Sequence, residues 1–268
     1  MRSNLQKKVL TVRDKHGTHR QTYYVADQEH PVQRPGHTVA TVAKPRDVAS
    51  VHYGMLWAGK ANKGVDEALN AIAKTHDVPS NLFRVKIRVV GSLEGSNGIY
   101  DFSKGPNSNQ IHVSKYAKQP AATMAHEYGH FLDHHLFGSG KPKLSSLGTH
   151  DSKNAKVQAE LKALKTAMYS SDAVQSLVKR HNEHVKEKDH IGKRYTSYLL
   201  EPAEIFARSY AQWIGLRSSP VVHRQIKEQG ATWRDHGYQA QWEDKDFEPI
   251  AREFDRLFAK RGLRNGRR

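Results

Sequence analysis

The sequence predicts an α+β fold in which a small mixed sheet comes first and helices dominate the second half. Apolar residues alternate with polar ones at residues 84–90, and short strand-like runs follow at 98–102 and 110–113. Further along the chain, apolar residues recur every three or four positions, which is the period of a helix. The length of 268 residues permits one large domain or one domain with appendages.

The N-terminal region predicts a β-hairpin followed by a linker. Residues 9–13 and 21–25 have the composition of strands and flank a turn, as in a hairpin. Residues 26–48 carry prolines, histidines and charges without any period, which indicates a linker or arm. We therefore divide the chain into an N-terminal part, residues 1–48, and a larger domain, residues 49–268.

The larger domain is expected to begin with a helix and a few strands. Residues 65–72 have the apolar spacing of an amphipathic helix, and the strand at 84–90 follows it. The two short strands at 98–102 and 110–113 are then joined across a Gly-Pro-Asn turn. The next helix begins at Pro120, because proline suits the first position of a helix.

This helix carries the run His126-Glu127-Tyr128-Gly129-His130, the clearest chemical signal in the chain. Residues four apart share one helix face, so both imidazoles could hold one divalent metal at the roughly 2.0–2.1 Å that zinc keeps from histidine. Glu127 projects to the side, where it can take a proton from a water on that metal. Gly129 costs about 1 kcal/mol of helix stability relative to alanine, which suggests close approach by another backbone.

The alternative is that the motif is a coincidence. The chain contains 17 histidines, and an accidental match occurs in about one in twenty such chains. His134 continues the i, i+4, i+8 series, but two helical turns place it about 12 Å from His126 along the axis. We expect His134 to be solvated or to lie behind the ligands.

Glu204 is the candidate for a third ligand, since a catalytic zinc typically takes three protein ligands. Pro202 suits the first position of a second helix, in which large apolar residues recur at helical spacing. Glu204 lies on another face with Ala207 and Ala211, whose small side chains would let this helix pack closely on the first. The alternative is a solvated glutamate, the usual fate of a surface residue of this type.

Together, the two segments resemble the gluzincin branch of the zincin metallopeptidases. The resemblance rests on His-Glu-Tyr-Gly-His-Phe-Leu-Asp at residues 126–133 and on a later tyrosine with Glu-Ile-Phe-Ala at residues 204–207. Within this branch the chain is most similar to lethal-factor-like proteases and to peptidases encoded by phages and other mobile elements. The match covers residues 50–260 in organisation, but only the two motif segments are specific.

The resemblance implies a zinc-dependent endopeptidase with a zincin-like domain, in which a small mixed sheet and an active-site helix precede a helical C-terminal lobe. It implies that His126, His130 and Glu204 bind Zn²⁺. It also implies that Glu127 is the general base and that Tyr198 can donate a hydrogen bond to the oxyanion.

The chain departs from the family pattern in two places. Arg208 stands where some gluzincins carry an acid that orients a ligand histidine, which leaves Asp133 and Glu201 as substitutes for that role. A helical insertion over about residues 150–190 could shape the cleft or simply pack over the core. In the zincin fold an extended substrate pairs with the edge strand of the sheet, and we expect this edge at residues 110–114.

Composition and charge limit the remaining possibilities. The formal charge is +16, and the tail from Lys260 onward is the densest basic cluster. This excess favours non-specific association with nucleic acid or other polyanions through counterion release, although no nucleic-acid recognition motif is present. The chain has no cysteine, so thiol catalysis is excluded.

The sequence also shows no signal peptide and no apolar run long enough for a membrane span. We therefore expect a cytoplasmic protein of the host cell, or a virion-associated one, that acts on a protein or peptide substrate. The alternative is a basic virion-associated or nucleic-acid-associated structural protein that keeps the zincin scaffold without turnover.

Overall fold

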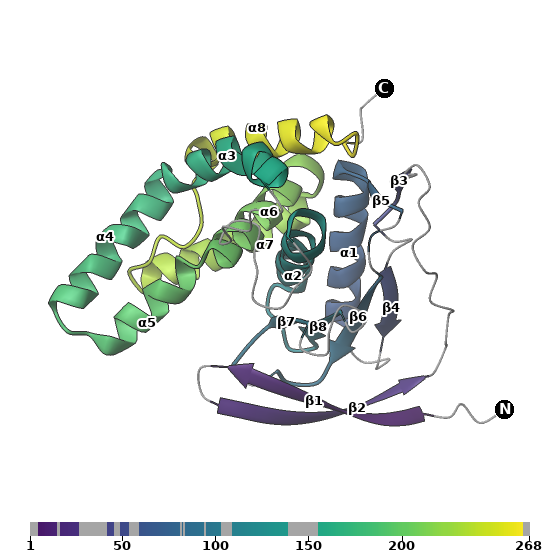
Figure 1. Cartoon of the computed structure of the whole chain (residues 1–268). Helices are drawn as coiled ribbons and strands as arrows, with labels where there is room; N and C mark the ends of the chain where they lie inside the picture. The colour runs from purple at the N-terminus through teal and green to yellow at the C-terminus, as the bar shows by residue number, and fades with distance from the viewer. Residues whose placement is uncertain are drawn as a thin grey trace.

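The computed structural model describes residues 5–14, 17–26, 42–45, 49–53, 59–80, 82, 84–93, 95–102, 109–138 and 155–264, and up to residue 43 only the backbone. These residues form an α+β fold with a small mixed sheet and mostly helices (Figure 1). Apart from one helix at Gly59–Thr75, the strands come before the helices along the chain, which confirms the predicted fold class at this level. None of the helices in the described ranges combines the length and apolar character that a membrane crossing needs.

The main sheet has four strands, in the order β4 (Ala49–Tyr53), β6 (Val85–Val90), β8 (Gln110–Ser114) and β7 (Gly98–Asp101). β4, β6 and β8 run parallel, and β7 pairs antiparallel with β8. The expected edge at residues 110–114 is therefore wrong, because β8 lies inside the sheet and β7 is at its edge. β7 and β8 form a hairpin, and its second strand, β8, is the one that pairs with β6.

Two smaller sheets complete the strands of the described ranges. β1 (Leu5–Asp14) and β2 (Gly17–Ala26) form an antiparallel hairpin, as predicted. The predicted linker lies largely outside the described residues, but its described part contains β3 (Val42–Ala43), which pairs with β5 (Val78–Pro79). The turn predicted between β7 and β8 also lies outside the described residues.

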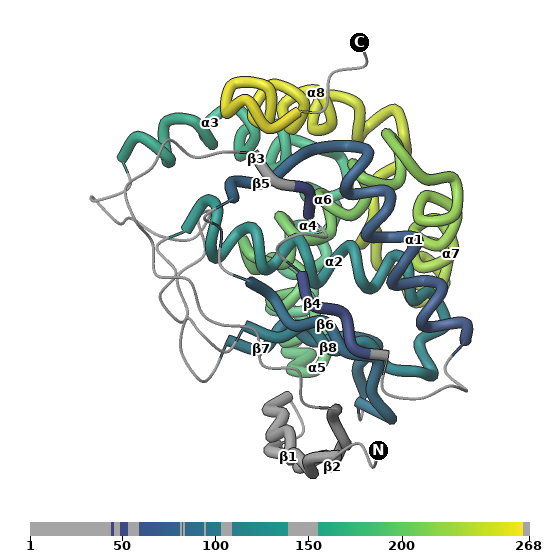
Figure 2. The backbone as a smooth tube through the Cα atoms, turned by 90° about the vertical axis from the view of Figure 1, so that its right-hand side faces the viewer, coloured from purple at the N-terminus to yellow at the C-terminus, as the bar shows by residue number. Residues whose placement is uncertain are grey.

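Four helices surround the centre of the larger domain: α1 (Gly59–Thr75), α2 (Pro120–Leu132), α6 (Pro202–Ser218) and α7 (Pro220–Asp235). α2 packs against the other three and against β7 and β8 (Figure 2). A π-helical turn, residues Asp133–Phe137, continues α2 and ends before Gly138. Every residue from 204 to 215 is buried, so α6 is an interior helix with polar residues that must find partners inside the protein.

The remaining helices are α3 (Ala155–Tyr169), α4 (Asp172–Lys186), α5 (His190–Leu199) and α8 (Asp244–Lys260). α3 packs on α8, whereas α4 and α5 form a helical hairpin that projects from the body (Figure 1). The predicted insertion thus contains α3, α4 and the turn that leads into α5.

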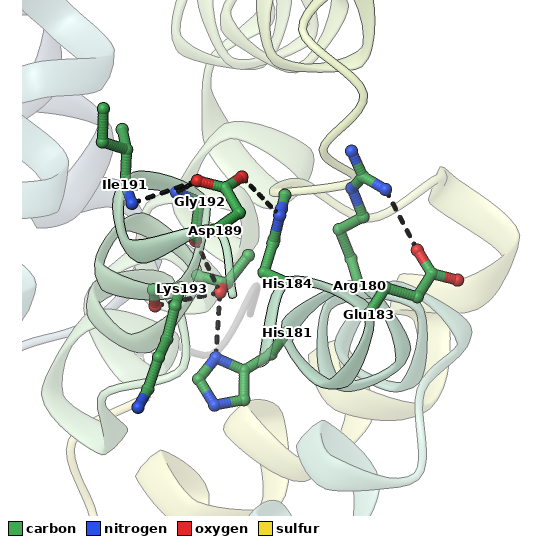
Figure 3. A network of polar contacts seen from close by, with 9 residues as sticks. Arg180, His181, Glu183, His184, Asp189, Ile191, Gly192 and Lys193 are labelled. Atoms are coloured by element: carbon green, nitrogen blue, oxygen red, sulfur yellow. Dashed lines mark hydrogen bonds and ion pairs between the residues drawn. The ribbon is translucent and has the colours of Figure 1, made fainter. Parts of the chain in front are cut away.

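Polar contacts close the α4–α5 hairpin at its tip, as Figure 3 shows. Asp189 accepts hydrogen bonds from the backbone N–H groups of Ile191 and Gly192, and its other oxygen lies 2.8 Å from Nδ1 of His184. Nδ1 of His181 lies 2.9 Å from Oγ1 of Thr196. The contacts of Asp189 join the end of α4 to the start of α5, and the contact between His181 and Thr196 joins the two helices further from the tip.

Candidate metal centre

α2 is buried along almost its whole length. Eleven of its thirteen residues are buried, and the two exceptions are His126 and His130. The helix therefore reaches solvent at the imidazoles of His126 and His130, the two histidines of the HExxH motif at residues 126–130. Their i, i+4 spacing places both on one face, with Nε2 of His126 3.1 Å from Nε2 of His130.

α6 crosses α2 at a backbone contact beside these histidines. A Cβ atom placed on Gly129 would lie 3.0 Å from Cα of Ala207 and 3.3 Å from its carbonyl oxygen. The close approach expected at Gly129 is therefore present. It brings Glu204, one turn before Ala207, to the same place as His130.

The structure brings His126, His130 and Glu204 into one cluster. The glutamate oxygens lie 3.4 Å from Nε2 of His126 and 3.1 Å from Nε2 of His130. A tetrahedral zinc with bonds of about 2.0–2.1 Å separates its ligand atoms by about 3.3–3.4 Å. The observed separations of 3.1, 3.1 and 3.4 Å are close to these edges, so the donor set fits zinc in chemistry and in size.

The charges within the cluster favour a cation between the three side chains. Burial opposes ionisation of both Glu204 and His130, but their mutual attraction and hydrogen bonding outweigh it. The pKa of Glu204 is held well below its usual range, and the pKa of His130 is raised to about 9. The Glu204 carboxylate thus stabilises positive charge at the imidazoles, whether a proton or a metal ion supplies it.

Glu127 is buried beside the edge strand of the sheet. It is 7% exposed, and the backbone N–H of Tyr100 in β7 donates a hydrogen bond to it. Burial raises its pKa, as does the charge of Glu204, whereas His126 and His130 lower it. The carboxylate is therefore more basic than a solvated one, which suits a proton acceptor.

Gly98 in β7 leaves the space that this carboxylate occupies. A Cβ atom at Gly98 would lie 2.9 Å from Oε1 of Glu127 and 2.5 Å from Cγ2 of Thr123. Any side chain at this position would displace Glu127. This role of Gly98 was not predicted from the sequence, because the contact joins a strand and a helix that no local pattern connects.

Tyr198 approaches the cluster from the last turn of α5. Its side chain is 44% exposed, but its hydroxyl makes a hydrogen bond with Glu204. Burial raises the pKa of this hydroxyl, and so do the charges of Glu204 and Glu127. The hydroxyl is therefore a proton donor beside the candidate ligands.

Asp133 and Glu201, the acids proposed to orient a ligand histidine, lie in different environments. Asp133 is 2% exposed in the π-helical turn, and its charge contributes to the raised pKa of His130. Glu201 is exposed at the N-cap of α6, where partial burial of its carboxyl group and the charge of Glu204 raise its pKa. His134 is 7% exposed and its Nδ1 lies 2.9 Å from the hydroxyl of Tyr100. Of the two positions expected for His134, the solvated one is therefore wrong, and a position behind the ligands stays a prediction.

Arg208 has a role that its sequence position did not reveal. It is 5% exposed, and its guanidinium donates hydrogen bonds to the backbone carbonyls of Leu199, Ala240 and Glu204. The same group lies over the ring of Trp242, with its carbon 5.5 Å from the ring centre. Arg208 therefore joins the end of α5, next to Tyr198, to the helix that carries Glu204.

Comparison with family models, with curated proteins and with solved structures gives no match for this chain. Its functional assignment therefore depends on the residues of the cluster and on their surroundings.

Proposed function

We propose that the protein is a zinc-dependent endopeptidase of the gluzincin type. The observation that carries the proposal is the cluster of His126, His130 and Glu204, whose ligand atoms are spaced 3.1–3.4 Å apart. An isolated HExxH motif would not require a glutamate from 74 positions downstream (204 − 130) to lie against its second histidine. The buried carboxylate of Glu127 beside the cluster supplies the base that hydrolysis needs.

Zinc bound here would lower the pKa of a water ligand and polarise the scissile carbonyl. Glu127 would accept the proton of the attacking water and pass it to the leaving amine. Tyr198 would donate a hydrogen bond to the oxyanion, a contact often worth about 2.7–4 kcal/mol. This assignment needs neither a serine nor a cysteine nucleophile.

β7 is the strand available for the substrate in this proposal. It is the sheet edge next to α2, and it contacts Glu127 through Gly98 and Tyr100. An extended peptide could add to this edge through main-chain hydrogen bonds. The scissile bond would then lie close to Glu127.

The first experiment is elemental analysis of protein purified without a metal-affinity column, together with hydrolysis of an unfolded protein such as casein. We expect one zinc per chain and hydrolysis that a chelator abolishes. Glu127→Gln should keep the zinc and lose hydrolysis, whereas Glu204→Ala should lose both. Glu228→Ala, which changes a half-exposed glutamate on α7, is the matched control.

Absence of zinc after reconstitution at neutral pH would overturn the metal assignment. Full zinc binding by the Glu204→Ala variant would overturn the choice of third ligand. Zinc binding without hydrolysis of any unfolded substrate would instead favour the alternative, a structural protein on a metal-binding scaffold.

A further inference from the structure

α3 and α8 lie side by side at one end of the molecule in both views (Figures 1 and 2). A groove of about 740 Å³ runs between them. Small residues of α3 line it, among them Ala159 and Ala163, and the cationic side chains of Lys162, Arg252 and Arg256 border it. No lining residue belongs to α2, α5 or α6, so this groove is separate from the candidate metal centre.

The cations of this groove are largely uncompensated. Lys162 and Arg252 are exposed and make no ion pair with any carboxylate in the described ranges. Among the residues that the structure describes, Arg256 is paired only with Glu253, which lies in the same helix at 2.6 Å and also lines the groove. Along α8, Lys260 follows Arg256 at the i, i+4 spacing, so cations one turn apart, about 6 Å along the axis, form a row.

Apart from Glu253, which is paired with Arg256, the acids of α3 and α8 near this row are engaged elsewhere. Glu160 is paired with Arg261, and Asp255 accepts hydrogen bonds from Trp213 and Arg217. Asp246 caps the first turn of α4 through two backbone N–H groups. The positive row therefore stays available to an external anion.

We propose that this α3–α8 face binds the phosphate backbone of duplex nucleic acid without reading its sequence. An extended row of cations suits a polymer of regularly spaced phosphates. The groove offers no large apolar residue to anchor an amphipathic helix. It also has no aromatic side chain on which unpaired bases could stack, so a duplex fits better than a single strand.

The test compares two variants of equal net charge, each with three substitutions. One removes Lys162, Arg252 and Lys260 by Lys→Gln and Arg→Gln changes. The other removes three exposed lysines of the α4–α5 hairpin: Lys179, Lys186 and Lys193. Binding to a 20-base-pair duplex of random sequence is measured by fluorescence anisotropy at several salt concentrations.

Each phosphate contact contributes a slope of about −0.9 to log K against log salt. We expect the α3–α8 variant to bind less tightly at every salt concentration and its slope to become shallower by about 3. The hairpin variant should change the slope by less than about 1. Casein hydrolysis and zinc content should be the same in both variants and in the unmodified protein, which separates this proposal from the peptidase assignment.

Equal losses in the two variants would show that net charge alone attracts nucleic acid and would overturn the proposal. So would a wild-type affinity for poly-glutamate that equals the affinity for the duplex. Thermal unfolding checks that both variants fold, and the single changes Lys162→Gln and Arg252→Gln repeat the test if a triple variant does not. Each single change should make the slope shallower by about 1.

Discussion

Gly129 and Ala207 are the residues at which α2 and α6 meet backbone to backbone. The 3.0 Å between a hypothetical Cβ of Gly129 and Cα of Ala207 leaves no room for a methyl group without a shift. Because His130 follows Gly129 and Glu204 precedes Ala207 by one turn, this crossing sets the distance between the two candidate ligands.

Gly129→Ala should therefore weaken metal binding. The added methyl group forces the helices apart, and such overpacking costs about 1–3 kcal/mol of stability. The higher helix propensity of alanine offsets about 1 kcal/mol of this cost. We expect zinc affinity, measured by titration calorimetry, to fall about tenfold or more. Gly59→Ala is the control, since its added Cβ would meet no atom within 4 Å. Unchanged zinc affinity in the Gly129→Ala variant would show that the crossing does not set the site.

Tyr198→Phe should separate metal binding from catalysis. The change removes the hydroxyl that bonds Glu204 but leaves the three candidate ligands intact. We expect zinc to be retained and kcat to fall by about 10²–10³, the usual effect of losing one oxyanion donor, with little change in KM. Tyr116→Phe, at a side chain that is 67% exposed, should leave both constants unchanged. A normal kcat in the Tyr198→Phe variant would reject the role of this hydroxyl.

Arg208→Met should destabilise the protein and loosen α5. The carbonyls of Leu199 and Ala240 would each lose a charged donor, a bond worth about 1.5–3 kcal/mol, although removal of a buried charge offsets part of the loss. We expect a net loss of about 2–4 kcal/mol in urea unfolding and faster amide exchange in α5. Arg224→Met, at a side chain that is 68% exposed, should stay within about 0.5 kcal/mol of the unmodified protein. Unchanged exchange in α5 would show that Arg208 does not hold this helix.

His76 should make the fold sensitive to acid. It is fully buried between Tyr210, whose hydroxyl lies 2.8 Å from Nε2, and the carbonyl of Asp77. Burial lowers its pKa from 6.5 to about 4, so the unfolded chain takes up the proton first. The contribution of neutral His76 to the free energy of unfolding is complete above pH 6.5. About 3 kcal/mol of this free energy is lost as pH falls from 6.5 to 4.

Urea unfolding across this range should show a smaller loss in His76→Gln than in the unmodified protein. The difference between the two isolates His76, because other buried histidines such as His112, with its pKa also lowered to about 4, are present in both. Parallel curves would show that His76 is not responsible.

Local patterns accounted for most of the elements. The alternation at residues 84–90, the proline at 120 and the spacing after Pro202 each depend on neighbours within one strand or helix. The meeting of Glu204 with the HExxH helix was also accessible, because Gly129 and the small residues Ala207 and Ala211 indicate that two helices approach closely. These predictions needed no knowledge of the wider topology.

The arrangement of strands and the polar interior were not accessible in this way. Whether β7 or β8 lies at the edge depends on which strand of a hairpin pairs with β6, and both have similar composition. The sequence comparison set Arg208 against the acid that some gluzincins carry at this position. In the structure its guanidinium donates hydrogen bonds to the backbone carbonyls of two other segments. Contacts between segments far apart in sequence leave no periodic trace.

The distance in sequence between the motif histidines and Glu204 means that the histidines are synthesised well before the glutamate. Glu204 comes 74 positions after His130 (204 − 130), a separation that ribosomes translate in roughly 4–15 s at about 5–20 residues per second. During that interval the nascent chain carries the base and two imidazoles but lacks the carboxylate that completes the cluster. The proposed peptidase would thus become competent only after most of its own chain has been made, so the growing polypeptide would not be exposed to its own activity.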